Sequence, residues 1–281
     1  MTDLQKKSLN LLKEFLRITK ELSLNYYLVC GSVLGAVKYQ GFIPWDDDID
    51  VGMPREDYDI FIREAPAMLK SEYFLANYHT EPTNPIIYSK LRDSTTTFIE
   101  TSVKKMNINH GIYIDIFPLD SYTTKNRKEF ELKKYVLQKL LASDYYRKSL
   151  VKKVAFGILK VIKKILNKDL ICRYESMIKN EWKNEGDIIC NHGNWQGNLE
   201  YSPKWHYGNG TWAMFEGIKV RIPENYDAYL QQKYGDWRAT LPIEKQISHH
   251  VCEVCDVYKP YTAYIEKCSN GNVYVKQNKN I

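Results

Sequence analysis

The chain concentrates its most chemically useful side chains in one short stretch. Four carboxylates lie within five positions: Asp46, Asp47, Asp48 and Asp50. A β-strand here places Asp48 and Asp50 on one face, because successive side chains point to opposite faces. Two carboxylates about 5 Å apart repel by roughly 3 kcal/mol at an effective dielectric constant of about 20. Mg²⁺ or Mn²⁺ removes this repulsion, so the stretch predicts a divalent-cation site, with an acidic surface turn as the alternative.

The residues before the acids favour the cation site. An apolar strand is predicted over residues 26–30, and it leads into Gly31 and Ser32, whose small side chains and backbone amides can approach a phosphate closely. A strand, a Gly-Ser turn, a short helix and Asp-x-Asp on a second strand resemble the nucleotidyltransferase superfamily. The string GSVLGAVKYQGFIPWDDDIDVG, residues 31–52, resembles the LicD family, whose relatives include the fukutin-type transferases.

A second motif, GIYIDIFPLD, covers residues 111–120. Asp115 stands among apolar residues of a predicted strand, where an unpaired carboxylate is costly. A backbone amide, Lys90 or Arg92 could balance its charge. The motif also resembles the second signature of the LicD family, which implies that Asp115 is the third metal-site carboxylate. Asp120 follows Pro118 and is predicted to be a cap or loop residue.

The resemblance implies a function and a fold. The fold is an α/β (α+β) nucleotidyltransferase-type mixed sheet flanked by helices. The activity is transfer of phosphocholine, or a similar phosphoalcohol, from CDP-choline or another CDP-alcohol to a hydroxyl of a cell-surface glycan, with release of CMP. Lipopolysaccharide, teichoic acid, a capsule precursor or a lipid-linked glycan is the implied acceptor. Asp48, Asp50 and Asp115 are the implied catalytic and metal-binding residues, with Mg²⁺ or Mn²⁺ as the cofactor.

Other residues are expected to contact the substrate: Gly31, Ser32, Lys38, Trp45, Asp46, Lys90, Arg92 and His249. Trp45 is the candidate for the choline group, since ring faces bind quaternary ammonium ions. Two other functions stay open. One is a true nucleotidyltransferase that releases pyrophosphate, and the other is a non-catalytic module whose basic helix binds a membrane or nucleic acid. For the transferase, no nucleic acid partner is expected.

The composition fits an ordinary globular protein of 281 residues, with 44% hydrophobic and 26% charged residues. No stretch of about 18 apolar residues occurs, and the first residues lack a secretory apolar run. We therefore expect a cytoplasmic protein, with peripheral contact to the inner face of the plasma membrane left open. Six cysteines without a small-domain spacing predict reduced thiols.

The chain is predicted to consist of three parts. Residues 1–124 form a nucleotidyltransferase-like catalytic core, residues 125–184 a basic helical insertion, and residues 185–281 a C-terminal part that completes the core and the substrate site. In the first part, a capping box at the second and fifth residues predicts an amphipathic helix that reaches Leu22. A further helix and three short strands are expected at 54–69, 73–78, 86–91 and 96–100.

The basic character belongs to one segment. Residues 125–168 carry a net charge of +11, against +6 for the whole chain, so the remainder carries −5. A helix predicted over 148–168 has lysines on one side, Lys152, Lys153, Lys160, Lys163 and Lys164. Its other side is apolar, with Leu150, Val151, Val154, Ile158, Val161, Ile162 and Ile165. The favoured interpretation packs the apolar side on the core and leaves the lysines in water. A lysine face directed at an anionic membrane is the alternative.

The C-terminal part contains two informative patterns. Residues 215–223 predict two strands around a Glu-Gly turn, followed by a helix that Pro223 opens and Gly235 ends, which again resembles the LicD family. His249, His250, Cys252 and Cys255 could bind a metal, but zinc needs four ligands at a closed site and no second Cys-x-x-Cys exists. The cysteines are instead predicted to lie in a strand, and a histidine beside them to contact a substrate phosphate.

Overall fold

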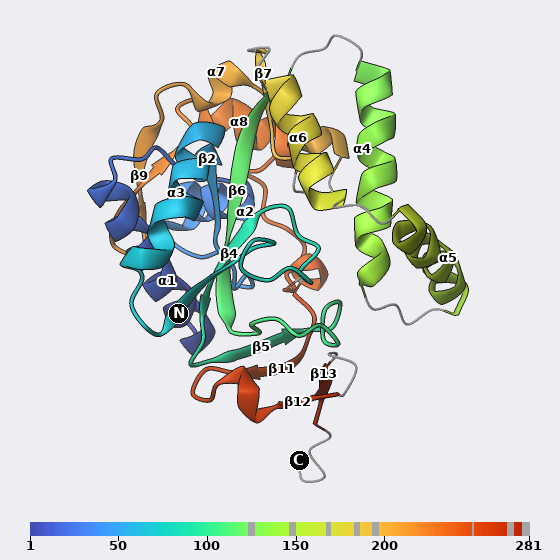
Figure 1. The fold of residues 1–281 in the computed structure, drawn as a ribbon. Coiled ribbons are helices and arrows are strands. Elements are labelled where there is room, and N and C mark those ends of the chain that lie inside the picture. The colour runs from blue at the N-terminus through green and yellow to red at the C-terminus, as the bar shows by residue number, and fades with distance from the viewer. Residues whose placement is uncertain are drawn as a thin grey trace.

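The structure, a computed structural model, describes residues 1–122, 127–145, 150–166, 170–182, 186–192, 197–248, 250–268 and 273–276. Its helices are α1 (Asp3–Glu21), α2 (Cys30–Leu34), α3 (Arg55–Met68), α4 (Arg127–Leu141), α5 (Leu150–Leu166), α6 (Leu170–Trp182), α7 (Lys204–Tyr207) and α8 (Tyr226–Tyr234). Its strands are β1 (Tyr27–Leu28), β2 (Asp50–Pro54), β3 (Tyr73–Ala76), β4 (Ser89–Asp93), β5 (Thr97–Glu100), β6 (Ile112–Tyr122), β7 (Ile188–Cys190), β8 (Tyr201–Pro203), β9 (Thr211–Phe215), β10 (Ile218–Ile222), β11 (Cys252–Asp256), β12 (Ile265–Lys267) and β13 (Val273–Val275). A mixed sheet flanked by helices is therefore confirmed (Figure 1).

The largest sheet is organised around β6, an 11-residue strand. The strand order is β1-β2-β6-β4-β3, with β2 parallel to β6 and β4 antiparallel to it. The last three residues of β6 pair with β7, which pairs in turn with β8. Almost every position of β6 is buried, as the apolar run in its sequence predicts. Because β6 pairs with β2, β4 and β7, it connects the parts of the sheet to one another.

Helix α1 begins as its sequence predicts. The Gln5 backbone N–H donates to Thr2 Oγ1 over 3.1 Å, and the Thr2 N–H donates to Gln5 Oε1 over 2.8 Å, which completes the capping box. Its fully buried residues recur at helical spacing: Leu11, Leu12, Phe15 and Ile18. Through this side α1 packs on the sheet, and it also contacts α3. The helix predicted over 54–69 is confirmed as α3, and the three strands predicted between 73 and 100 are present as β3, β4 and β5.

Two predictions about the acidic stretch need correction. The strand expected over 26–30 is only Tyr27–Leu28, because Cys30 adopts a positive φ of 53° and begins α2. The second strand starts at Asp50, so Asp48 lies in the loop before it instead of on the strand. Two side chains of α1 hold this loop in place: Gln5 donates to the Asp46 carbonyl over 2.8 Å and Ser8 to the Asp47 carbonyl over 3.2 Å.

The prediction for Asp120 is wrong. It lies in β6, fully buried, and pairs in register with Cys190 of β7. Its two oxygens accept hydrogen bonds from Arg55 at the start of α3, with distances of 2.7 and 2.8 Å. A bidentate guanidinium satisfies a carboxylate that burial would otherwise destabilise. The sequence could not reveal this pair because its members lie 65 positions apart.

The favoured interpretation of the basic helix is also wrong. Helix α5 forms, but five of its apolar side chains are exposed: Val154, Ile158, Val161, Ile162 and Ile165. Leu159 packs against a second apolar core, which is centred on Tyr122, Phe130, Tyr174 and Tyr201. The helix therefore attaches to the molecule by a side that the apolar pattern did not identify. Among the described residues, no helix is both long enough and apolar enough to cross a bilayer.

The C-terminal part returns to the N-terminal elements. Strands β9 and β10 form the predicted hairpin, and Glu216 and Gly217 both have positive φ, as a two-residue type I′ turn requires. Helix α8 follows and ends at Gly235, as predicted. Both strands and α8 contribute to the main core. The cysteines lie in β11, as predicted, and this strand pairs with β5.

Candidate active site

Asp50 and Asp115 lie side by side on neighbouring strands. They are partners in the parallel pairing of β2 with β6, and the Asp115 N–H donates to the Ile49 carbonyl over 2.9 Å. Neighbouring strands are about 4.8 Å apart, so two carboxylates at paired positions on the same face are close together. Asp48 is two residues before Asp50. The sheet register, which the sequence could not provide, thus brings the three implied metal ligands to one end of β2.

The electrostatics of these acids favour a bound cation. Burial, together with the negative charge of Asp115, raises the pKa of Asp50 to about 8. Burial and the charge of Asp50 raise the pKa of Asp48 well above its usual value, and burial raises that of Asp115. The side chains of Asp48 and Asp115 still expose 18% and 13% of their surface. The cluster is therefore crowded with negative charge yet accessible to a small ion.

Lys90 is the lysine that reaches this cluster. It faces Asp115 across β4 and β6, with its Nζ 2.9 Å from Asp115 Oδ1 and 3.4 Å from the centroid of the Tyr113 ring. Its other acidic neighbour is Glu100, at 3.8 Å. Burial alone would raise the pKa of Glu100, but the charges of Lys90 and Arg92 hold it below its usual value. Lys90 is thus placed between the cluster and a second carboxylate.

Arg92 stands deeper in the same strand. Its guanidinium donates to the Gly111 carbonyl over 2.9 Å and lies 3.5 Å from Glu100. Its side chain is almost fully buried. In this arrangement Arg92 supports Glu100 and the start of β6, while Lys90 meets the carboxylates directly. The two cations that the sequence proposed as equivalent therefore occupy different positions.

His250 completes the acidic side of the site. Its Nδ1 lies 3.0 Å from Asp47 Oδ1, and its Nε2 lies 3.2 Å from Asp48 Oδ2. Burial alone would lower the pKa of His250, but the hydrogen bond to Asp47 and the charge of Asp48 raise it to about 10. The predicted substrate residue, His249, lies outside the described residues. The His-His pair was the signal in the sequence, and His250 is the member that the structure places beside the acids.

The donor set suits a hard divalent cation. Ligand atoms of Asp46, Asp47 and His250 lie within 4.8 Å of one another, whereas within the described part of the chain Asp48, Asp50 and Asp115 are not gathered so closely. The latter three are nevertheless oxygen donors on adjacent backbone segments. Burial raises their pKa values, the charge of a neighbouring carboxylate adds to this for Asp48 and Asp50, and a cation would favour their ionised forms. The residues present therefore fit Mg²⁺ or Mn²⁺. The possible metal ligands grouped with His250 are carboxylates, and they do not include the cysteines of β11.

The Gly-Ser turn lies against the acids. Ser32 Oγ accepts a hydrogen bond from the Asp50 N–H over 2.8 Å, and a Cβ added to Gly31 would lie 3.1 Å from Asp46 Oδ2. The Cys30 N–H donates to the Tyr229 hydroxyl over 2.9 Å, so α8 fixes the strained residue before the turn. These contacts bring Gly31, Ser32 and the acidic loop together as the sequence proposed.

Two other predicted substrate residues lie on the following segment. Trp45 is half-buried and meets the Tyr39 ring edge to face, with 6.2 Å between centroids. Lys38 instead donates to the carbonyls of residues 237–239, over distances of 3.3, 3.0 and 2.7 Å. An ammonium has three donors, so this arrangement occupies all of them. Trp45 thus packs on Tyr39 directly before the acids in the chain, while Lys38 joins its segment to the residues that follow α8.

Comparison with known proteins identifies relatives of this chain. Residues 23–155 match the family model described as the LicD/FKTN/FKRP nucleotidyltransferase domain. A Haemophilus influenzae protein described as lipopolysaccharide cholinephosphotransferase LicD is 30% identical over 264 residues, covering 87% of this chain and 94% of that protein. The chain belongs to the LicD family. Shorter matches are to uncharacterized proteins of Rickettsia typhi, 42% identical over 57 residues, and Rickettsia prowazekii, 43% identical over 56 residues. These cover 19% and 18% of this chain and 18% and 21% of the respective relatives.

The match to the LicD family domain includes the Gly-Ser turn, the acidic stretch and Asp115, but ends before Glu216. Glu216 is a residue that sequence reasoning missed. Its Oε1 accepts from the Phe42 N–H over 3.2 Å, and its own N–H donates to the Gln40 carbonyl over 2.8 Å. The β9–β10 turn thereby clamps the loop that carries the family motif. The only sequence signal was the Glu-Gly turn, which indicated a hairpin but not its contact.

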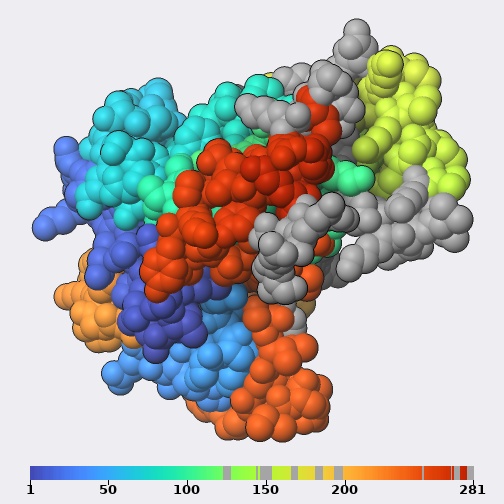
Figure 2. Space-filling model, turned by 90° about the horizontal axis from the view of Figure 1, so that it is seen from below, coloured from blue at the N-terminus to red at the C-terminus, as the bar shows by residue number. Residues whose placement is uncertain are grey.

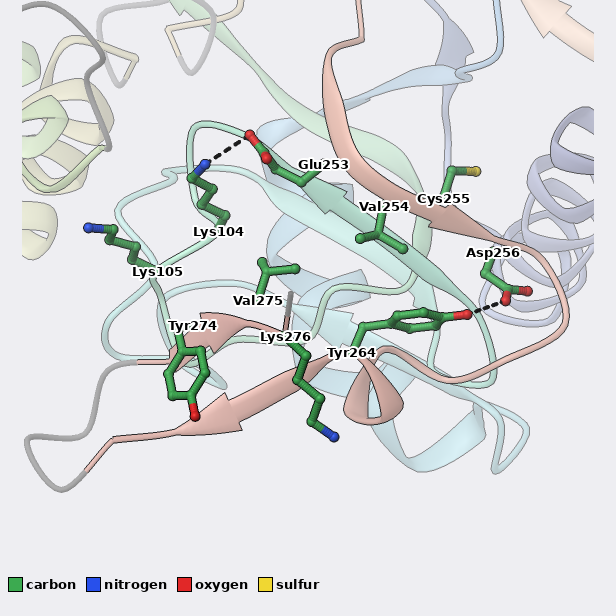
Figure 3. Close-up of a pocket in the computed structure, with 10 residues that line it drawn as sticks. All are labelled: Lys104, Lys105, Glu253, Val254, Cys255, Asp256, Tyr264, Tyr274, Val275 and Lys276. Carbon is green, nitrogen blue, oxygen red and sulfur yellow. Dashed lines mark hydrogen bonds and ion pairs between the residues drawn. The ribbon is translucent and has the colours of Figure 1, made fainter. Parts of the chain in front are cut away.

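A cavity of about 750 Å³ lies beside β11 and the β12–β13 hairpin (Figure 3). Its lining includes Lys104 with Glu253, and Tyr264 with Asp256, and each pair is joined by an interaction drawn in Figure 3. None of the predicted LicD-type site residues lines it. This cavity is therefore distinct from the acidic site.

Proposed function

We propose that this protein is a LicD-type phosphocholine transferase. It moves phosphocholine, or a similar phosphoalcohol, from a CDP-alcohol to a hydroxyl of a cell-surface glycan and releases CMP. The observation that carries this proposal is the alignment over 94% of a relative described as a lipopolysaccharide cholinephosphotransferase. The buried carboxylates at the end of β2 support it, because they offer the charge that a metal-bound diphosphate requires.

In the proposed reaction, the acceptor oxygen attacks the phosphorus that carries the alcohol. A new P–O bond forms, and the bond from this phosphorus to the bridging oxygen of CMP breaks in line. The hydroxyl loses its proton to solvent or to a carboxylate of the cluster, and CMP leaves with the electron pair. Asp48, Asp50 and Asp115 would hold Mg²⁺ or Mn²⁺, which when bound offsets negative charge on the diphosphate.

The remaining residues have proposed roles in binding. Gly31 and Ser32 lie against the acids, and their small side chains and backbone amides would contact a phosphate of the donor. Lys90 supplies positive charge at Asp115. Trp45, which directly precedes Asp46 in the chain, would offer a ring face for the cationic alcohol. The two ends of the donor would thus bind to opposite kinds of surface, one acidic and metal-loaded, the other aromatic.

The acceptor and the compartment follow from the same proposal. Lipopolysaccharide is the acceptor in the name of the Haemophilus influenzae relative, and teichoic acid and capsule precursors present comparable hydroxyls. A nucleotide-activated donor is made in the cytoplasm, so we propose that the reaction takes place there.

Product analysis tests the proposal. The protein is incubated with Mg²⁺, CDP-choline and a hydroxyl-bearing lipopolysaccharide or teichoic acid fraction, and nucleotides are separated by anion-exchange chromatography. Formation of CMP together with choline-labelled glycan is expected. Pyrophosphate formed from CTP and phosphocholine, without CMP from CDP-choline, would assign a nucleotidyltransferase instead. No turnover of either donor by a folded, metal-binding protein would favour a non-catalytic module.

A further inference from the structure

Helix α5 presents an apolar surface to solvent. Five of its residues expose between 40% and 75% of their surface: Val154, Ile158, Val161, Ile162 and Ile165. At about 100° per residue, they fall within about 100° of the helix circumference and form one continuous line. We call these five residues the α5 strip. Exposing a strip of branched aliphatic side chains to water costs free energy, so we expect another surface to cover it.

The attachment of α5 does not use this strip. Leu159 is partly buried against the second core, and Phe156 is also half-buried. At about 100° per residue, both lie on the side of the helix away from the centre of the strip. The helix also contacts α4 and the turn at Ala142–Asp144. The strip is thus left open by the packing that holds the helix in place.

Positive charge lies beside the α5 strip. Lys164 is exposed at one edge of the strip, about 60° around the helix from Val161, and Lys160 is exposed one turn earlier and about 40° farther from the strip. The surrounding segment, residues 125–168, carries +11 while the rest of the chain carries −5. Two copies of this segment repel each other, whereas an anionic surface attracts it. The charge therefore selects a negatively charged occupant over a second copy of the same face.

We propose that the α5 strip docks on an anionic lipid surface, with the helix axis in the plane of the membrane. The valine and isoleucine side chains enter the acyl boundary. Lys164, at the edge of the strip, meets the headgroup phosphates, and the long side chain of Lys160 extends toward them from farther around the helix. A helix of 17 residues with one apolar side is suited to lie in this interface. This inference goes beyond the proposed function, since docking needs neither donor nor acceptor.

The position of α5 is compatible with docking. Figure 1 shows it at the margin of the molecule, beyond α4, and Figure 2 shows the yellow-green part of the chain at the edge of a second view. Helix α4, which contacts α5, also has exposed apolar side chains at Leu132 and Tyr135. A marginal helix can meet a flat surface without displacing the sheet that carries the carboxylates.

Vesicle co-sedimentation of the full chain, without nucleotide, tests the proposal. The probes are vesicles of phosphatidylglycerol mixed with phosphatidylcholine, and vesicles of phosphatidylcholine alone, at low and high salt. Binding is expected only to the anionic vesicles and should weaken as salt rises. Ile158→Ser with Ile165→Ser should weaken binding at least about tenfold, since both side chains lose their apolar transfer energy. Lys160→Gln with Lys164→Gln should weaken it roughly thirtyfold at low salt.

Matched controls change the same residue types elsewhere. Ile243→Ser with Val251→Ser alters two exposed apolar side chains outside α5, and Lys219→Gln with Lys245→Gln alters two exposed lysines. Both controls should bind like the wild type, and circular dichroism should report the same helix content in all variants. Equal sedimentation of the α5 variants and wild type would overturn the proposal. So would light scattering that finds a wild-type dimer and a monomeric Ile158→Ser, Ile165→Ser variant, because a second copy would then cover the strip.

Discussion

Asp50 is paired with Asp115 across two parallel strands, and burial together with the charge of Asp115 raises the pKa of Asp50 to about 8. Asp50→Asn removes one of the negative charges without altering the backbone, whose N–H still reaches Ser32. We expect kcat to fall at least about a hundredfold and Mg²⁺-dependent nucleotide binding to weaken. The metal-free Tm should stay equal or rise by about 2–4 °C, the shift that about 1 kcal/mol gives.

Thermal melts without metal and calorimetric titration with CDP-choline and Mg²⁺ measure these effects. Glu56→Gln, which removes an exposed acid from α3, serves as the control and should change neither. A large fall in metal-free Tm combined with retained turnover would mean that Asp50 is a structural partner of the Asp115 and Lys90 pair.

Trp45 is the residue at which substrate choice can be tested. Trp45→Leu keeps an apolar side chain but deletes the ring, so it should raise the KM for CDP-choline about two- to thirtyfold, as one cation–π contact of about 0.5–2 kcal/mol predicts. Binding of free CMP, which lacks the cation, should be nearly unchanged. Steady-state kinetics and CMP titrations compare the two ligands. Equal losses would assign the ring to cytidine or to the loop, and no loss would assign it to packing with Tyr39.

The β9–β10 hairpin offers a test at the scale of whole elements. A Cβ at Gly41 would come within 2.1 Å of Glu216 Oε1, so Gly41→Ala must displace the side chain that accepts from the Phe42 N–H. Glu216→Asn keeps a residue suited to the positive φ of 48° but is too short to reach the loop. Each single change should lower kcat/KM and stability, and their combination should cost less than the sum, with a coupling of about 0.5–3 kcal/mol.

Urea unfolding and initial rates on the four proteins of this cycle give the coupling. Additive effects would show that the turn and the motif loop act independently. In that case the hydrogen bond between Glu216 and the Phe42 N–H would have no influence on the site.

The sequence predicted elements that depend on local residues better than it predicted contacts between elements. Local signals sufficed for α1, whose capping box is formed by Thr2 and Gln5, and for the Glu216 turn with its positive φ. Contacts between segments that are far apart in the sequence could not be predicted. The position of Asp120 after Pro118 predicts a cap or loop residue, and its actual partner, Arg55, is 65 positions away in the sequence. Helical periodicity alone could not predict which side of α5 would be covered. The motif located the acids, but only the β2–β6 register places Asp50 opposite Asp115.

At the scale of the molecule, buried histidines contribute to the dependence of stability on pH. His192 is 2% exposed in the second core, and burial lowers its pKa to about 3. Its ordinary value is about 6.5, so between these values the unfolded chain binds more protons than the folded one. The contribution of His192 to the free energy of unfolding should therefore fall as pH drops through this range, by about 2 kcal/mol at about pH 5, whereas the raised pKa of Asp50 acts in the opposite direction.

Urea unfolding at pH 7 and pH 5 checks this dependence. His192→Phe keeps a flat ring beside Tyr122 and Phe130 but does not titrate, so between pH 7 and pH 5 its free energy of unfolding should gain about 2 kcal/mol relative to that of the wild type. His110, whose pKa burial lowers to about 4, titrates in both proteins and provides the common background. Identical pH dependence of the two proteins would contradict a neutral, buried His192.

The hydrogen bond from Cys30 to Tyr229 spans 199 positions of the chain. During synthesis at about 5–20 residues per second, the Gly-Ser turn therefore waits roughly 10–40 s for the helix that fixes it. In this interval Asp50 and Asp115 can already pair through β2 and β6, so a charged cluster forms on the nascent chain before its surroundings are complete. A cation captured at that moment would guide the last part of folding as well as the later reaction.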